Sequence, residues 1–236
     1  MTPLLWTLTL ALGAGLSIPL GALASTHARF RSLCVQHEVD SFVSYFGGGA
    51  LVAAVAMVLI PDGLEATSVP AASSAFLIGS VLFWQLSTRI ERRGGSFAQM
   101  LGMLLDFVPE AIALGAASAS GSDAGLLLAG LIVLQNLPEG FASFHEMRES
   151  GTSGARSWTI FLLAPLAGPL AAGLGYGWLD PDGEPLGLLM LFCSGGILYL
   201  VFEDIVPGAH LRHESFPALG AVLGFLLGMI GTTLTH

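Results

Sequence analysis

The chain has 236 residues, of which 53% are hydrophobic and only 11% are charged, and its mean hydropathy is +0.76. A soluble domain carries roughly 25% charged residues, so this composition excludes a water-soluble protein and indicates a lipid environment. The net charge of −9, with eight arginines and no lysine, leaves no basic surface for nucleic acid, and two cysteines without CxxC spacing exclude a disulfide framework.

Eight apolar stretches are long enough for helices that cross a bilayer, which need about 20 apolar residues each. Because these runs are long and do not alternate, they exclude membrane-spanning strands. No long linker separates them, so we expect a single transmembrane domain over residues 1–236. The stretches are Pro3–Ala24, Ser41–Ile60, Pro70–Thr88, Ser96–Ser118, Ala124–His145, Ser157–Leu179, Leu186–Val206 and Phe216–Thr235.

The first stretch is interpreted as a retained helix and not as a cleaved signal peptide. Met1–Ser25 lacks the basic segment that opens a signal peptide. Its apolar part is also long enough to span a bilayer.

The arginines predict the orientation of the chain. With eight spans, every arginine falls at or in the loops after spans 1, 3, 5 and 7. Arginine and lysine gather on the cytoplasmic side of membrane proteins, so both termini are expected outside. A different number of spans would divide the arginines between the two sides. They are Arg29, Arg31, Arg89, Arg92, Arg93, Arg148, Arg156 and Arg212.

Two motifs of the same form occur in spans 4 and 5, which run in opposite directions. Asp106-Phe-Val-Pro-Glu110 and Gln135-Asn-Leu-Pro-Glu139 lie 29 residues apart. A weaker echo links the antiparallel spans 2 and 7, where Phe and Gly precede Pro61 and Pro207 by equal spacings. Inverted repeats with broken helices at the membrane centre indicate the binding site of a transporter.

The polar residues of these motifs lie near the middle of their spans. Asp106 and Glu110 are four residues apart, as are Gln135 and Glu139, so each pair shares a helix face. A carboxylate at this depth costs at least ~2.5–3.5 kcal/mol, and no span contains an arginine or lysine to offset it. A divalent cation held between the two helices would offset this cost. The alternative is that the carboxylates are protonated and structural.

Proline precedes the glutamate in both motifs. A proline inside a helix removes one backbone hydrogen bond and kinks the helix. The carbonyls of Leu105 and Leu134 are therefore expected to be free, as further oxygen ligands or as anchors for water.

Glu203 and Asp204 lie in the inner part of span 7, shortly before Pro207. One interpretation is a metal exit station that leads to the cytoplasm. The other is that these carboxylates are solvated at the helix end, and for Asp204 this is the preferred interpretation.

Together these features resemble the ZIP (Zrt-, Irt-like) family of metal transporters, as a divergent member of prokaryotic type. The resemblance covers nearly the whole chain, and it includes Glu203-Asp204-Ile-Val-Pro207 in span 7. It implies an all-α membrane protein of eight transmembrane helices in a 3+2+3 inverted-repeat bundle, with both termini outside. It further implies metal uptake toward the cytoplasm by alternating access, a homodimer, and a place in the bacterial inner (cytoplasmic) membrane. The metal ligands that it implies are Asp106, Glu110, Gln135 and Glu139.

The sequence also departs from the family pattern. The family often has His where Asp106 stands and Asn where Phe107 stands, and phenylalanine cannot bind metal. The family's two-metal centre commonly takes a glutamate from span 6 for its second metal, but span 6 has no carboxylate here. Asn136 could still offer one oxygen to that second metal. A site of carboxylates and amides is harder than one with His or Cys, so we expect manganese or iron to be accepted alongside zinc and cadmium.

Two other functions fit the same residues less well. A membrane-embedded hydrolase would use Glu110 and Glu139 with a metal-bound water, but no HExxH motif is present. A homologue that binds metal without transporting it is the other alternative. We expect a protein that is not an enzyme and uses no cofactor. Its partners would be the metal ion as substrate and the lipid bilayer.

Overall fold

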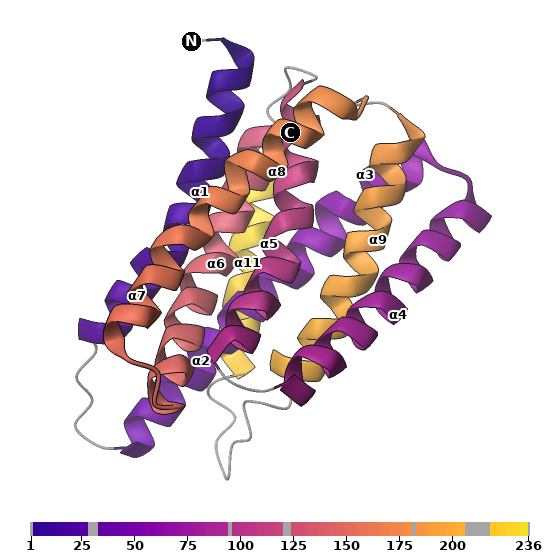
Figure 1. Cartoon of the computed structure of the whole chain (residues 1–236). Coiled ribbons are helices and arrows are strands. Elements are labelled where there is room, and N and C mark those ends of the chain that lie inside the picture. Colours follow the sequence, from indigo (N-terminus) through magenta and orange to yellow (C-terminus); the bar gives the residue numbers. More distant parts are fainter. Residues whose placement is uncertain are drawn as a thin grey trace.

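The computed structural model describes residues 2–27, 33–93, 96–119, 124–180, 183–205 and 218–235, and these residues are helical almost throughout, without a strand. The helices form an elongated bundle (Figure 1). In chain order they are α1 (Pro3–His27), α2 (Leu33–Ala54), η1 (Val55–Leu59), α3 (Ile60–Ala66), α4 (Val69–Arg93), α5 (Ser96–Ala119), α6 (Ala124–Glu149), α7 (Gly154–Leu163), η2 (Ala164–Leu166), α8 (Ala167–Trp178), α9 (Glu184–Leu200), η3 (Val201–Ile205) and α11 (Ala218–Thr235).

Each of the eight apolar stretches coincides with a helix or with a run of joined helices. Six helical segments in the described residues are long and apolar enough to cross a membrane, and Ala218–Thr233 is a shorter apolar helix. The 24 residues of α5 extend over about 36 Å, which exceeds the ~30 Å of a hydrocarbon core. An all-helical membrane protein is therefore confirmed, whereas the count of eight spans stays a prediction.

Three of the rods change their helical geometry part of the way along. η1 and η3 are π-helical turns, and η2 is a 3₁₀ turn that contains Pro165. By contrast, α5 and α6 continue through Pro109 and Pro138, where the sequence predicts kinks. One proline removes only one hydrogen bond from the helix, so a helix can continue through it, and the kinks at these two residues stay a prediction.

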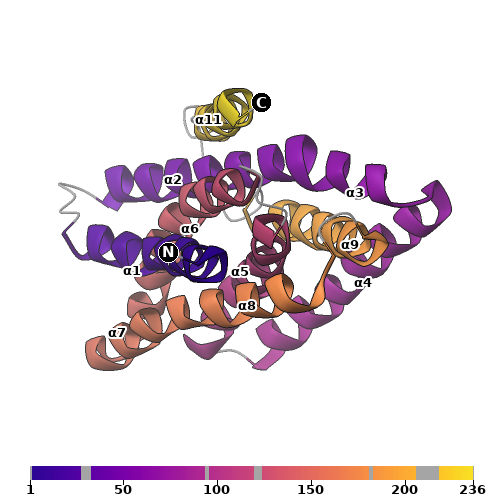
Figure 2. The ribbon, with the colours of Figure 1, turned by 90° about the horizontal axis from the view of Figure 1, so that it is seen from above.

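The helices pack in two groups, which Figure 2 shows from above. The first group, here called the site group, contains α1, α5, α6, α7 and α8. The second, the flanking group, contains α2, α3, α4, α9 and α11, with α11 on the outer side of α2. The two groups meet mainly where α2 lies beside α6 and where α9 lies beside α5.

Glycines bring backbones into close contact inside each group. A Cβ atom added to Gly140 would lie 2.3 Å from the Ile18 carbonyl oxygen, and one added to Gly115 would lie 2.0 Å from that of Ala172. In the flanking group, a Cβ on Gly224 would lie 2.0 Å from the Phe46 oxygen. Some described glycines lie near the other group. For these, the nearest atoms of the other group to an added Cβ are side-chain atoms, at 3.4 Å or more. Small residues at helix interfaces permit this approach.

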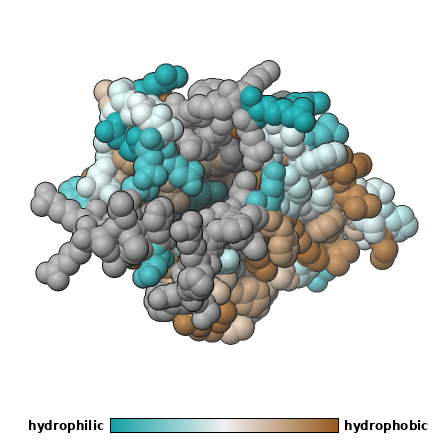
Figure 3. Space-filling view, turned by 90° about the horizontal axis from the view of Figure 1, so that it is seen from below, coloured by the Kyte–Doolittle hydropathy of each residue, from teal (hydrophilic) through white to brown (hydrophobic). Residues whose placement is uncertain are grey.

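The exterior of the bundle is apolar, as a surrounding of lipid requires. On α4, the side chains of Leu77, Ile78 and Val81 are all largely exposed. Seen from the end opposite the N-terminus, hydrophobic side chains form part of the rim, while hydrophilic ones gather elsewhere on this face (Figure 3). Both chain termini lie toward the same end of the bundle (Figure 1), as an even number of crossings requires.

Candidate metal site

The centre of the candidate site is a pair of polar side chains that join α5 and α6. Glu110 is 3% exposed and Gln135 is 1% exposed. The Nε2 atom of Gln135 donates a hydrogen bond to Oε2 of Glu110. The two motifs predicted to face each other are therefore in direct contact in the apolar interior of the bundle.

Amide atoms around this contact lack partners in the part of the chain that the structure describes. Oε1 of Gln135 and both Oδ1 and Nδ2 of Asn136 are buried and accept or donate no hydrogen bond there. A buried polar atom without a partner costs about 1–3 kcal/mol. Such atoms mark a place where a cation or water would be stabilised.

Glu139 completes the set on α6. It lies one helical turn after Gln135, on the same face, and it is half-buried. Carboxylate and amide oxygens from two helices are thus presented to one region between α5 and α6. These are the hard oxygen ligands that divalent cations accept.

The side chain of Asp106 lies outside the described residues, although its backbone belongs to α5. Within the described residues, no three His, Cys, Asp or Glu side chains form a group that could hold a metal ion. The site proposed here depends on amides as well as carboxylates, so its ligand set is of a different kind.

No described arginine lies near the middle of a helix. Arg89 and Arg92 lie in the last two turns of α4, Arg148 lies in the last turn of α6, and Arg156 lies in the first turn of α7. All four are exposed. Charge on the buried carboxylates would therefore have to be neutralised by a proton or by a cation from solution.

Glu203, the remaining predicted ligand, lies apart in the chain within the π-helical turn η3. Its Oε2 atom accepts a hydrogen bond of 2.8 Å from the hydroxyl of Ser87 on α4. Glu203 is half-buried and Ser87 is buried. Its described partner thus belongs to the flanking group, whereas Asp204 and Pro207 have no described side-chain environment.

Two features of the site were not identified in the sequence. Ser87 was not a candidate, although a serine inside an apolar span was a usable signal. The π-helical turns η1 and η3 each end two residues before a proline, Pro61 or Pro207. The spacing of those prolines was noted, but π-helical turns depend on packing that no local pattern specifies.

Comparison with known proteins identifies relatives of one kind. No family model matches the chain. It is 28% identical to the zinc transporter ZIPB of Bordetella bronchiseptica over 132 residues, and 30% identical to the zinc transporter GufA of Myxococcus xanthus over 133 residues. It is 26% identical to the zinc transporter ZupT of Chlorobium luteolum over an alignment of 270 positions.

These matches differ in how much they cover. The first two comprise 55% and 56% of this chain and span 43% and 52% of the relatives' own lengths. The match to the ZupT protein comprises 94% of this chain and 93% of that relative. All three relatives are named zinc transporters, and the resemblance to the ZIP transporters found in the motifs is confirmed.

Proposed function

We propose that this chain, a relative of the ZIP metal transporters, carries divalent metal cations across a membrane through the carboxylate and amide site between α5 and α6. The observation that carries this proposal is the buried contact of Glu110 with Gln135 beside partnerless amide atoms. An apolar bundle tolerates such groups when a cation is bound. The relatives, all named zinc transporters, support zinc as one cargo.

The cargo range follows from the ligand types. The oxygens of Glu110, Gln135, Asn136 and Glu139, together with those of Asp106, would bind zinc and cadmium. Because the set contains neither imidazole nor thiolate, it also suits manganese and iron. Glu203 would act as a later station on the path toward the cytoplasm, held by Ser87 until the metal arrives.

Alternating access would arise from motion of the site group against the flanking group. Close backbone contacts at glycines join the helices inside each group, as Gly140 does with Ile18. Between the groups, a Cβ on Gly47 would make ordinary van der Waals contacts, with the ring of Pro138 at 3.4 Å and the Gln135 carbonyl oxygen at 3.7 Å. An interface of ordinary side-chain contacts can slide with less disruption than one of interlocked backbones. The π-helical turns at matching offsets from Pro61 and Pro207 also fit an inverted repeat.

A disulfide between the two groups tests this motion. The 3.4 Å from a Cβ at Gly47 to Cβ of Pro138 is close to the ~3.5–4.5 Å of natural disulfides. We expect the doubly substituted protein, Gly47→Cys with Pro138→Cys, to take up metal when reduced and to stop when oxidised. The single variant Pro138→Cys controls for the loss of proline. Equal uptake in the oxidised and reduced forms would disprove relative motion of the groups.

Metal uptake by the purified chain in liposomes tests the proposed function. Zinc, cadmium, manganese and iron are each offered outside, and uptake is compared with that of liposomes without protein. We expect flux of all four ions. Zinc flux without manganese or iron flux would refute the broad cargo range, and metal binding without any flux would favour a non-transporting homologue.

A further inference from the structure

The two Pro-Glu motifs carry residues of similar type at corresponding positions, polar, apolar, Pro and Glu, except at one pair that differs sharply in chemistry. Position by position, Phe107 of α5 corresponds to Asn136 of α6, each directly after the first polar residue of its motif. Both side chains are 0% exposed. One repeat therefore places a phenyl ring where the other places an amide.

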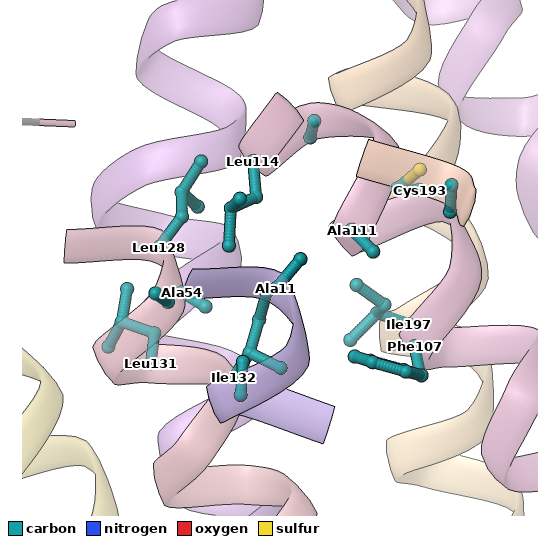
Figure 4. Close-up of a cluster of buried hydrophobic side chains, with 14 of the residues drawn as sticks. Ala11, Ala54, Phe107, Ala111, Leu114, Leu128, Leu131, Ile132, Cys193 and Ile197 are labelled. Carbon is teal, nitrogen blue, oxygen red and sulfur yellow. The ribbon is translucent and has the colours of Figure 1, made fainter. Parts of the chain in front are cut away.

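The Phe107 ring occupies a space prepared by two glycines of the site group. Its outer carbon, Cζ, would lie 3.0 Å from a Cβ added to Gly15 of α1 and 2.7 Å from one added to Gly168 of α8. Any side chain at either glycine would collide with the ring. Phe107 thus fills the space between α1, α5 and α8, within the buried hydrophobic cluster drawn in Figure 4.

Asn136 lies on the face of α6 that packs against α1. It lies one helical turn before Gly140, and the backbone of Gly140 packs on Ile18 of α1. Both atoms of its amide are without a hydrogen-bond partner among the described residues. On the side of the two motifs that faces α1, α6 therefore offers ligand atoms from Asn136. At the corresponding position of α5, Phe107 offers none.

We infer that the central site holds one metal ion and not two, because the Phe107 ring occupies the place that would mirror Asn136. This inference rests on the proposed function. The ion is held by the ligand set of the proposed function, in which Glu110 and Glu139 supply carboxylates and Gln135 and Asn136 supply amides. The ring closes the side of the site toward Gly15 and Gly168 to metal and water.

Equilibrium dialysis of the full chain in detergent against radioactive cadmium tests this. The quantity measured is the number of cadmium ions bound per chain minus the number bound by the same protein with Glu139→Ala added. This subtraction removes binding elsewhere on the surface. We expect a difference of one ion for the wild-type protein. We expect Phe107→Asn to raise it above one, toward two, and Phe107→Leu, which keeps an apolar side chain there, to leave it at one.

Each result has a defined meaning. A wild-type difference of two ions overturns the inference, as does a Phe107→Asn protein that elutes as a single folded species and still binds one. If Phe107→Asn does not fold, the wild-type difference alone decides. Uptake measured on the same preparations separates the two proposals: one bound ion without uptake refutes transport alone, and uptake with two bound ions refutes the one-metal site alone.

Discussion

A methyl group at Gly140 should separate α1 from α6, whereas one at Gly130 of the same helix should not. A Cβ on Gly140 would lie 2.3 Å from the Ile18 carbonyl oxygen, and one on Gly130 has nothing within 4 Å. Because non-bonded atoms pack at roughly 3.5 Å, Gly140→Ala forces the backbones apart by about 1 Å. Glycine to alanine also favours a helix by roughly 0.5–1 kcal/mol, a gain that both variants share and that cancels in their comparison.

The difference between Gly140→Ala and Gly130→Ala is therefore the cost of overpacking, roughly 1–3 kcal/mol. For a chain of this size it corresponds to a difference of roughly 2–12 °C in the melting midpoint. Thermal unfolding of the two proteins in the same detergent, with zinc absent, measures it. Indistinguishable midpoints, or a higher midpoint for Gly140→Ala, would refute the close packing of α1 on α6 described here.

Three further predictions concern the site and its orientation. Gln135→Leu removes both the hydrogen-bond donor to Glu110 and one metal ligand. Zinc binding, measured by titration, should therefore weaken by at least about tenfold, or ~1.4 kcal/mol. Unchanged zinc binding would show that Gln135 is not part of the site. Ser87→Ala frees Glu203, so it should slow zinc uptake while zinc affinity at the central site stays at the wild-type value, and an equal loss of both would contradict a separate station. In cells, a cysteine at Arg92 should resist an impermeant thiol reagent from outside whereas one at Ser68 reacts, and labelling of both would contradict the orientation.

Hydropathy and charge were enough to place the helices. Runs of about 20 apolar residues have one stable form in lipid, because every backbone polar group must be bonded within the helix. For that reason α4, predicted over Pro70–Thr88, was found over Val69–Arg93. Its extra residues at the C-terminal end include Arg92, which hydropathy leaves out although the helix continues.

The site was predicted in part, for a reason visible in its residues. Glu110 and Gln135 were identified because polar groups at mid-span are costly and therefore stand out, and the structure joins them. The packing of Phe107 against Gly15 and Gly168 was not foreseeable, because it joins three helices from distant parts of the chain. The partner of Glu203, Ser87, lies 116 residues away and was missed for the same reason.

The central claim is that the buried polar contact between α5 and α6 is the place through which metal crosses the membrane. Zinc uptake into liposomes by the wild-type chain, Glu110→Ala, Glu139→Ala and Glu65→Ala tests it most directly, since Glu65 is an exposed carboxylate at the end of α3. We expect wild type and Glu65→Ala to transport alike, and both central variants to fall to the level of protein-free liposomes. Undiminished uptake by either central variant, at wild-type protein density, would contradict the account.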